Sequence, residues 1–315
     1  MNKWKVTWHW ACVLILAVPA VALAQNKPRI VVVTHGQTGD PFWLIVRNGV
    51  DAAARETGVD VEYRAPERFD MVAMAQLVDA AAASRPAGMV VSIPDTAALS
   101  KSIQAAAARL PVVVINSGSE VYKKLGCLMY IGQEEVDAGN KAGRRMKALG
   151  VKKVVILNQE IGNFALEQRA KGFTDGFAGP FHHVEVLPVK MDFSQCRAAV
   201  AAYLAENRDV DGIMALGPIA AEPALEVLNA EGKIGKIQLC AFDLSPALLD
   251  ALSNRQMAFA LDQQQWLQGY LPVVFLANYA KYGLILQNDF ILTGPSFVTP
   301  ENAGRVVDLL TLGFH

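Results

Sequence analysis

Polar and aromatic side chains gather directly after the apolar runs of this sequence. Asp40, Phe42 and Trp43 follow the run "RIVVVT". Other candidates have the same placement in the sequence: Asn116 and Ser117, Gln159 to Phe164, Met191, Gly217, Asp243 and Gln263. Carboxylates and amides form hydrogen bonds, and aromatic rings supply apolar contact area. No catalytic set is recognisable among them, so these residue types indicate binding of a small molecule.

Motifs that would indicate a cofactor, a metal or an enzyme are incomplete. The stretch "GQTGD" has neither G-x-G-x-x-G nor P-loop spacing. "INSGS" is not G-x-S-x-G, and no histidine is evidently paired with its serines. His182 and His183, with Glu185 nearby, point to opposite faces of a predicted strand and do not form a metal site. We therefore expect no cofactor, no metal and no enzymatic activity.

Strand-like and helix-like segments alternate from Arg29 onward. "RIVVVT" is a continuous apolar run, which is typical of a buried parallel strand. The segment after Pro41 is amphipathic, with apolar residues at Val46 and Val50 and with Gly58 as its predicted C-cap. Two such series predict right-handed βαβ units in two parallel sheets. Ligands bind beyond the C-terminal ends of such strands, where the polar residues above occur.

Length and charge fit an exported globular protein with two cores. The chain has 315 residues and a net charge of -1, so nothing indicates a nucleic-acid partner. The first 24 residues carry Lys3 and Lys5, an apolar run and a small-residue site at 22–24, which predicts a cleaved signal peptide. A membrane anchor is the alternative, but the run is short and contains Pro19.

Three cysteines follow the predicted signal peptide. Cys127, Cys196 and Cys240 are an odd number at wide and irregular spacing. We interpret them as buried small side chains, although one pair could oxidise in an exported protein.

An ordered series of motifs resembles a known family, the class I periplasmic solute-binding proteins of ABC importers, in their ribose and galactose branch. "DPFW" stands in place of Asn-Pro-Phe-Phe after the first strand. The resemblance continues along nearly the whole mature chain through these segments: "GVDAAARETG", "RPAGMVVSIPD", "LPVVVINSG", "YIGQEEVDAGNKAG", "LEQRAKGF", "AFDLSPALLDAL" and "FALDQQQWLQGYLPV".

The resemblance implies an α/β fold of two Rossmann-like lobes with parallel sheets, joined by a three-crossover hinge. We place the crossovers near Ile131, near Gln263 and near Gly294 to Phe297. The N-terminal lobe is then expected at 27–131 plus 264–294, and the C-terminal lobe at 132–263 plus 295–315. Such lobes close on one small ligand, usually a sugar.

The resemblance also implies roles for individual residues. Phe42 and Trp43 match positions that stack on a sugar ring, although each could instead pack under the following helix. Asp40, Asp243 and Gln263 match polar ligand contacts. An aspartate at a strand end can also cap the next helix, which is the alternative for Asp243.

Five positions depart from the pattern of ribose binders. Asn116-Ser117 replaces an Asp-Arg pair, a pocket arginine aligns with Glu167, a strand-end asparagine with Gly217, and a pocket phenylalanine with Met191. A less charged pocket, roomier near Gly217, is therefore expected. Candidate substitutes for the lost polar groups are Asn116, Glu160, Asn163, Glu120 and Tyr122.

The resemblance predicts a periplasmic, monomeric binding protein that delivers its ligand to an ABC permease in the inner membrane. A sugar or polyol is the expected ligand, and a more apolar molecule is the alternative because of the missing arginines. A second alternative is a receptor module for a sensor kinase or chemoreceptor. A repressor core with the same lobes is disfavoured, because the chain offers no basic helix-turn-helix.

Overall fold

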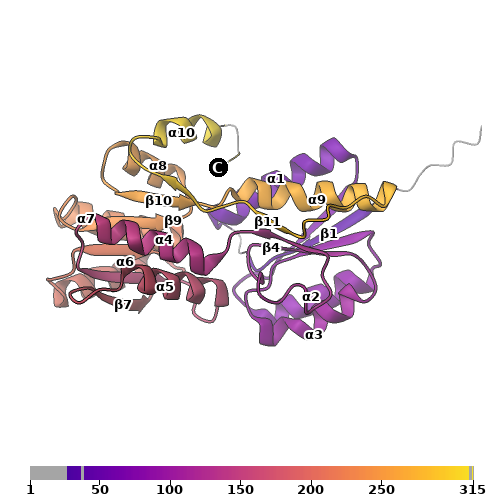
Figure 1. Cartoon of the computed structure of the whole chain (residues 1–315), viewed down its shortest axis with the longest axis horizontal. Coiled ribbons are helices and arrows are strands. Elements are labelled where there is room, and N and C mark those ends of the chain that lie inside the picture. Colours follow the sequence, from indigo (N-terminus) through magenta and orange to yellow (C-terminus); the bar gives the residue numbers. More distant parts are fainter. Residues whose placement is uncertain (1–26, 37–38, 312–313, 315) are drawn as a thin grey trace, which may run out of the picture.

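A computed structural model describes residues 27–36, 39–311 and 314 of the chain, so the predicted signal peptide lies outside the described residues. Figure 1 shows two α/β lobes side by side along the long axis. The prediction of two lobes with parallel-dominated sheets is confirmed. Among the described residues, no helix is long and apolar enough to cross a bilayer.

The first lobe is built on a sheet with the strand order β11-β5-β4-β3-β1-β2, in which every pairing is parallel. Its strands are β1 (Arg29–Val33), β2 (Asp60–Arg64), β3 (Gly88–Val91), β4 (Val112–Ile115), β5 (Met129–Gly132) and β11 (Phe290–Leu292). Its helices are α1 (Pro41–Thr57), α2 (Met71–Ala83), α3 (Thr96–Ala107) and α9 (Gln265–Tyr282).

The second lobe repeats this plan with the order β12-β10-β9-β8-β6-β7, and only β12 pairs in the antiparallel direction. Its strands are β6 (Lys153–Asn158), β7 (His183–Pro188), β8 (Gly212–Ala215), β9 (Gln238–Phe242), β10 (Phe259–Asp262) and β12 (Ser296–Val298). Its helices are α4 (Glu135–Ala148), α5 (Phe164–Phe177), α6 (Phe193–Glu206), α7 (Pro218–Ala230), α8 (Pro246–Ser253) and α10 (Ala303–Thr311).

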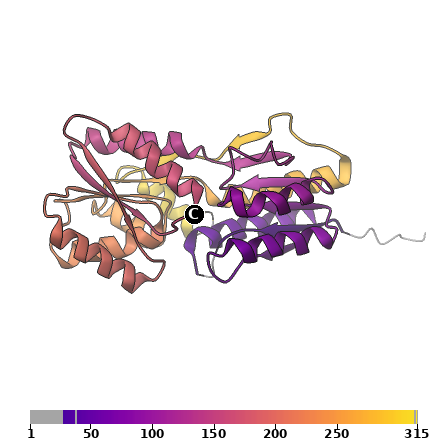
Figure 2. The same ribbon diagram turned by 90° about the horizontal axis from the view of Figure 1, so that it is seen from below.

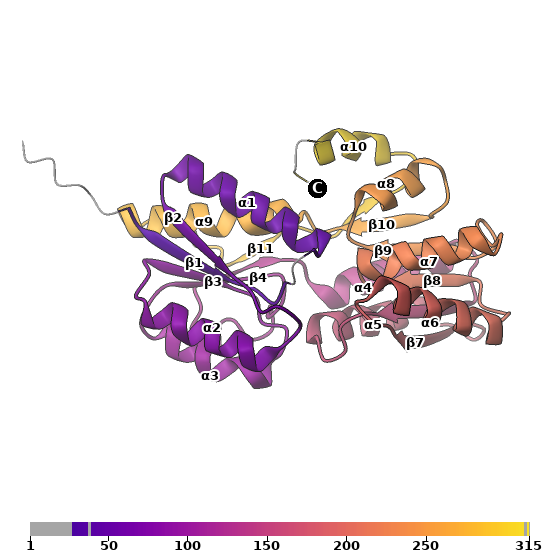
Figure 3. The ribbon, with the colours of Figure 1, turned by 180° about the vertical axis from the view of Figure 1, so that it is seen from behind.

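Each sheet is covered by helices on both faces, because successive residues of a strand point to opposite sides. In β1, Ile30 and Val32 pack under α1 and α9, whereas Val31 and Val33 pack against α2 and α3. Figure 3 shows α1 beside α9 on one side of the first sheet and α2 with α3 on the other. The three described cysteines are free and buried, as expected of small core side chains.

Three chain segments connect the two sheets. They follow β5, β10 and β11, so the predicted three-crossover hinge is confirmed. Figure 2 shows that these segments run close together between the lobes. The exact lobe boundaries given above stay a prediction.

Glycines allow the helices of each lobe to approach unusually closely. A Cβ atom at Gly143 of α4 would lie 2.2 Å from the carbonyl oxygen of Phe173 in α5, and one at Gly176 would lie 2.2 Å from that of Asn140. In the first lobe, a Cβ at Gly269 of α9 would lie 1.9 Å from the carbonyl oxygen of Val46. Backbone atoms cannot move aside alone, so these contacts fix the distance between the paired helices.

Gly143→Ala should therefore destabilise the protein by about 1–3 kcal/mol, because α4 and α5 must separate to admit the methyl group. Thermal or urea unfolding measures this change. The matched control is Gly304→Ala in α10, where a Cβ meets no atom within 4 Å. The control should be neutral or stabilising by up to about 1 kcal/mol. If the two variants are equally stable, the distance between α4 and α5 does not depend on the lack of a side chain at Gly143.

Candidate functional site

A cavity lies between the two lobes, at the C-terminal ends of the strands. It encloses about 410 Å³ of space outside protein atoms, with the solvent at its open mouth included. Loops after β1 and β4 contribute His35 and Asn116 from the first lobe, and loops after β6 and β9 contribute Glu160 and Asp243 from the second. The polar residues at strand ends are therefore brought together as predicted for open parallel sheets.

A buried guanidinium forms one wall of the cavity. Arg169 of α5 is 3% exposed and makes a two-point contact with Glu135 of α4, with Nε to Oε2 at 2.5 Å and Nη2 to Oε1 at 3.0 Å. Its Nη1 donates to the carbonyl oxygen of Leu216 at 3.1 Å and reaches Asp243 Oδ2 at 3.5 Å. Its guanidinium also lies over the ring of Phe242, 4.7 Å from the centroid. Such forked contacts fix the position of the group tightly.

The charges in this cluster hold each other in place. Burial alone would lower the pKa of Arg169, but the carboxylates of Glu135 and Asp243 raise it above its usual value. Burial raises the pKa of Glu135, while Arg169 and a hydrogen bond from Gln133 lower it. The guanidinium therefore stays charged, and removing it would leave Glu135 as an uncompensated buried charge.

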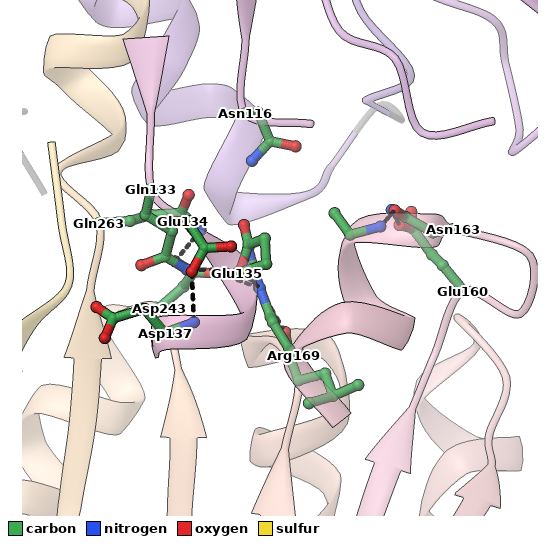
Figure 4. Close-up of polar contacts among 12 residues, drawn as sticks. Asn116, Gln133, Glu134, Glu135, Asp137, Glu160, Asn163, Arg169, Asp243 and Gln263 are labelled. Carbon is green, nitrogen blue, oxygen red and sulfur yellow. Dashed lines mark hydrogen bonds and ion pairs between the residues drawn. The ribbon is translucent and has the colours of Figure 1, made fainter. Parts of the chain in front are cut away.

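Asp243 connects this cluster to the hinge. It adopts a left-handed backbone conformation with φ of 64°, and its Oδ1 accepts from Gln263 Nε2 at 2.8 Å. Gln263 Oε1 accepts from Gln268 Nε2 at 2.8 Å, and that nitrogen also lies 3.2 Å from Thr293 Oγ1. Gln263 and Thr293 belong to two different crossovers, so a contact with Asp243 is linked by hydrogen bonds to the hinge itself. Figure 4 shows Asp243 and Gln263 together on one side of Arg169.

Residues of both lobes meet on the opposite side of the cavity. Asn163 of the second lobe donates from Nδ2 to Glu160 Oε2 at 2.7 Å and lies 3.5 Å from His35 Nε2 of the first lobe. His35 Nδ1 lies 2.8 Å from Ser92 Oγ. A backbone hydrogen bond from Phe164 to Pro94, 2.9 Å long, also joins the lobes. The lobes therefore touch across the cavity.

The titrating groups on this side are displaced from their usual ranges. Burial, assisted by the charge of Arg169, lowers the pKa of His35 to about 3, so His35 is neutral. Burial raises the pKa of Glu160 to about 7, although Asn163 and Arg169 both lower it. Burial and the charge of Glu160 raise the pKa of Asp40 to about 7.

Phe42 and Trp43 have two roles in the structure. Asp40 caps α1 by accepting from the backbone nitrogen of Phe42 at 2.9 Å, which directs the two rings. Both rings are 6% exposed, and both pack in the core under α9. Each also lines the cavity. A Cβ at Gly36 would lie 2.1 Å from the Trp43 ring, so this glycine lets the indole lie against the loop after β1.

Comparison with known proteins identifies the family. A family model described as "Periplasmic binding protein domain" matches residues 30–284, which is more than half of the chain. The chain belongs to this family of periplasmic binding proteins. Its members bind solutes and are not enzymes, which confirms the resemblance found in the motifs and the expected lack of enzymatic activity.

Individual relatives extend over nearly the whole of this periplasmic binding protein. A carbohydrate transporter from Acidothermus cellulolyticus 11B, solved in complex with myo-inositol, is 32% identical, with a TM-score of 0.86, and 92% of this chain and 100% of that chain are covered. A periplasmic sugar binding protein from Legionella pneumophila is 27% identical, with a TM-score of 0.79. The match covers 85% of this chain and 100% of that chain. The xylose/arabinose-binding protein XylF of Sulfolobus acidocaldarius is 25% identical over 87% of this chain and 71% of that protein.

Seven of the ten residues singled out from the sequence line the cavity of this periplasmic binding protein. They are Asp40, Phe42, Trp43, Asn116, Gly217, Asp243 and Gln263. Ser117 is buried and is not among the lining residues. Met191 lines a neighbouring hollow together with Asp40 and Ile219. Their contact with a ligand stays a prediction.

Glu167 is exposed and lies outside the cavity, whereas Arg169 lines it. Two residues correspond to about 200° of rotation along a helix, so the two side chains occupy opposite faces of α5. Leu166 and Phe173 lie three residues before and four residues after Arg169, and both are buried. That apolar spacing was the signal that could have identified Arg169 as the inward-facing residue.

The pocket is neither roomier near Gly217 nor weakly charged. A Cβ at Gly217 would lie 2.7 Å from Nε2 of Gln159, so the amide of Gln159 occupies that space. The lining includes Arg169 and the carboxyl groups of Asp40, Glu160 and Asp243. Of the candidate substitutes, Asn116, Glu160 and Asn163 line the cavity, and Glu120 and Tyr122 do not. Among the described residues, no group of three or more metal-ligating side chains is present.

Arg169→Met should destabilise this periplasmic binding protein by about 3–5 kcal/mol, because it leaves Glu135 buried without a partner. Adding Glu135→Gln removes that charge and should restore at least about 1 kcal/mol. Chemical unfolding of the two variants and the wild type measures the difference. If the double variant is no more stable than Arg169→Met, the loss does not come from an unpaired Glu135.

Glu160→Gln should change how stability depends on pH. The folded protein holds a proton on Glu160 up to about pH 7, whereas the unfolded chain releases it near pH 4.5, so wild-type stability falls as pH rises between these values. Glutamine does not titrate. The free energy of unfolding of the variant minus that of the wild type should therefore increase between pH 5 and pH 7, by at most about 1.4 kcal/mol per pH unit. The difference between their melting temperatures should increase in the same direction. A difference that is constant across this range would contradict the shifted pKa.

Proposed function

We propose that this protein binds a sugar or a cyclitol between its lobes and delivers it to an ABC permease of the inner membrane. The observation that supports it most strongly is the mixed lining of the cavity. Carboxyl oxygens accept hydrogen bonds, Arg169 and the amides donate them, and two aromatic rings form part of the wall. A polyhydroxylated ring needs that combination, since its hydroxyls both donate and accept while its C–H faces are apolar.

The relatives support the same class of ligand. The Acidothermus cellulolyticus protein was solved with myo-inositol, and the Legionella pneumophila protein is named a periplasmic sugar binding protein. A fully apolar ligand would leave the remaining acceptor sites of the carboxyl groups of Asp40, Glu160 and Asp243 without donors, which is costly. The polar lining therefore favours a sugar or cyclitol over the apolar alternative.

Closure of the hinge is the proposed mechanism. A ligand in the cavity touches residues of both lobes, so it binds the closed form better than the open form, and only such a difference in affinity shifts the population. Gln263 connects the ligand-facing carboxyl of Asp243 to the hinge residues Gln268 and Thr293. The closed form then presents the ligand to the permease. Export by a cleaved signal peptide and a monomeric state remain part of this proposal.

A thermal-shift experiment tests the proposal with myo-inositol, D-xylose, D-arabinose and D-ribose. At least one should raise the melting temperature, because a ligand that binds only the folded state stabilises it by RT ln(1 + [L]/Kd). Trp43→Ala should weaken the binding of that ligand about tenfold or more, since a large apolar contact is lost. Leu44→Ala is the matched control, because Leu44 follows directly in α1 and is 59% exposed.

The control should retain wild-type affinity. If no sugar or cyclitol stabilises the protein, the proposed ligand class is wrong. If one does, but Trp43→Ala binds it as tightly as the wild type, the cavity described here is not the binding site.

A further inference from the structure

The carboxyl groups of the cavity outnumber its cations. Among the described residues that line it, Asp40, Glu160 and Asp243 carry carboxyls and Arg169 is the one cation. That guanidinium is already engaged with Glu135 through two contacts and with Asp243 at 3.5 Å. His35 lies 4.0 Å from Glu160 but is neutral, because burial lowers its pKa to about 3. Among the described residues, no cation forms an ion pair with Asp40 or Glu160, although the charge of Arg169 lowers the pKa of Glu160.

Asp40 and Glu160 belong to different lobes and face the same space. Asp40 accepts from the backbone nitrogen of Phe42, and Glu160 accepts from Asn163 Nδ2. Arg47, the nearest basic residue of α1, has its guanidinium over the ring of Tyr63, 5.5 Å from the centroid. Burial, and for Asp40 also the charge of Glu160, raises both pKa values to about 7. Closing the lobes therefore brings together two carboxyls that resist ionisation.

The other side chains near Asp40 and Glu160 are suited to a ligand that carries both a cation and polar groups. Trp43 and Phe42 follow Asp40 directly and line the cavity, and aromatic faces attract ammonium groups. Asn116 is 6% exposed and lines the cavity, and no hydrogen bond of its side-chain amide is found within the described part of the chain. An amide that faces the cavity can both donate to and accept from a polar ligand group there.

A hollow beside the cavity adds a further carboxyl group. This hollow meets the cavity at Asp40 and Ile219, and it is also lined by Glu222, Met191 and Phe193. None of the described residues that line this hollow is basic. Carboxylates with no opposing cation attract positively charged ligands toward the site.

We propose that the ligand is an amine-bearing sugar or cyclitol whose ammonium group lies between Asp40 and Glu160. This inference rests on the proposed function, because the hydroxyls of the ligand occupy the donors and acceptors already described. The ammonium donates to both carboxylates, and it replaces the repulsion between the lobes by attraction. Closure then depends on the charge of the ligand as well as on its hydroxyls.

Matched ligand pairs test the inference on the wild-type protein. Isothermal titration at pH 7.5 compares D-glucosamine with D-glucose, and scyllo-inosamine with scyllo-inositol. In at least one pair the amine should bind about tenfold more tightly or better than its neutral partner. That ratio should fall at pH 5.5, because Asp40 and Glu160 are protonated there. N-Acetyl-D-glucosamine, which carries no charge, should bind no more tightly than D-glucose.

Two variants locate the ammonium group. Asp40→Asn and Glu160→Gln should each reduce the ratio of amine to neutral affinity about tenfold, whatever they do to absolute affinity. Asparagine also caps helices, so Asp40→Asn keeps the start of α1. The matched control is Asp70→Asn, which changes the N-cap of α2 outside the cavity and should leave both affinities unchanged.

The outcomes separate the two proposals. If neutral sugars or cyclitols bind as tightly as their amines at pH 7.5, the inference is overturned and the proposed function stands. If the amines are preferred but the ratio is unchanged in Asp40→Asn and Glu160→Gln, the location of the ammonium is overturned. If no compound of either kind binds, the proposed function fails together with the inference.

Discussion

The buried ion pair between Arg169 and Glu135 depends on the close approach of the two helices that carry it. Glu135 lies in the first turn of α4, and Arg169 lies in α5. A Cβ at Gly139 of α4 would lie 2.2 Å from the carbonyl oxygen of Arg169, and one at Gly172 of α5 would lie 2.1 Å from that of Val136. Larger residues would force the helices apart, and the two-point contact would then be lost. The wall of the cavity is thus set by backbone packing at Arg169 itself and at Val136, which is next to Glu135.

This arrangement explains why the fold was easier to predict than the site. The strands could be recognised because their residues form continuous apolar runs, and ligand-facing residues could be sought at the strand ends because parallel sheets bind ligands there. Asp40, Asn116 and Asp243 were found by this rule and do line the cavity. The rule locates a residue along the chain. It does not determine which face of a following helix points inward.

Arg169 and Gly217 show two ways in which the position of a residue along the chain is not enough to predict the lining of the cavity. The family pattern pointed to Glu167, but the helical phase set by Leu166 and Phe173 turns Arg169 inward instead. At Gly217 the missing side chain suggested empty space, yet Gln159, from the loop after β6, fills it. The first error could have been corrected from periodicity alone. The second could not, because it depends on a side chain from a different loop.

The balance of charge in the cavity is a property of the closed protein and not of any one segment. Asp40 is the N-cap of a helix in the first lobe, where a carboxylate is favourable, and Glu160 is an acceptor for Asn163 in the second lobe. Each is ordinary in its own lobe. Only when the lobes meet do the two carboxyls face one cavity whose single lining cation is already paired among the described residues. On the proposed closure mechanism, part of the free-energy difference between the open and closed forms resides in these two groups, and a ligand group that neutralises them favours closure.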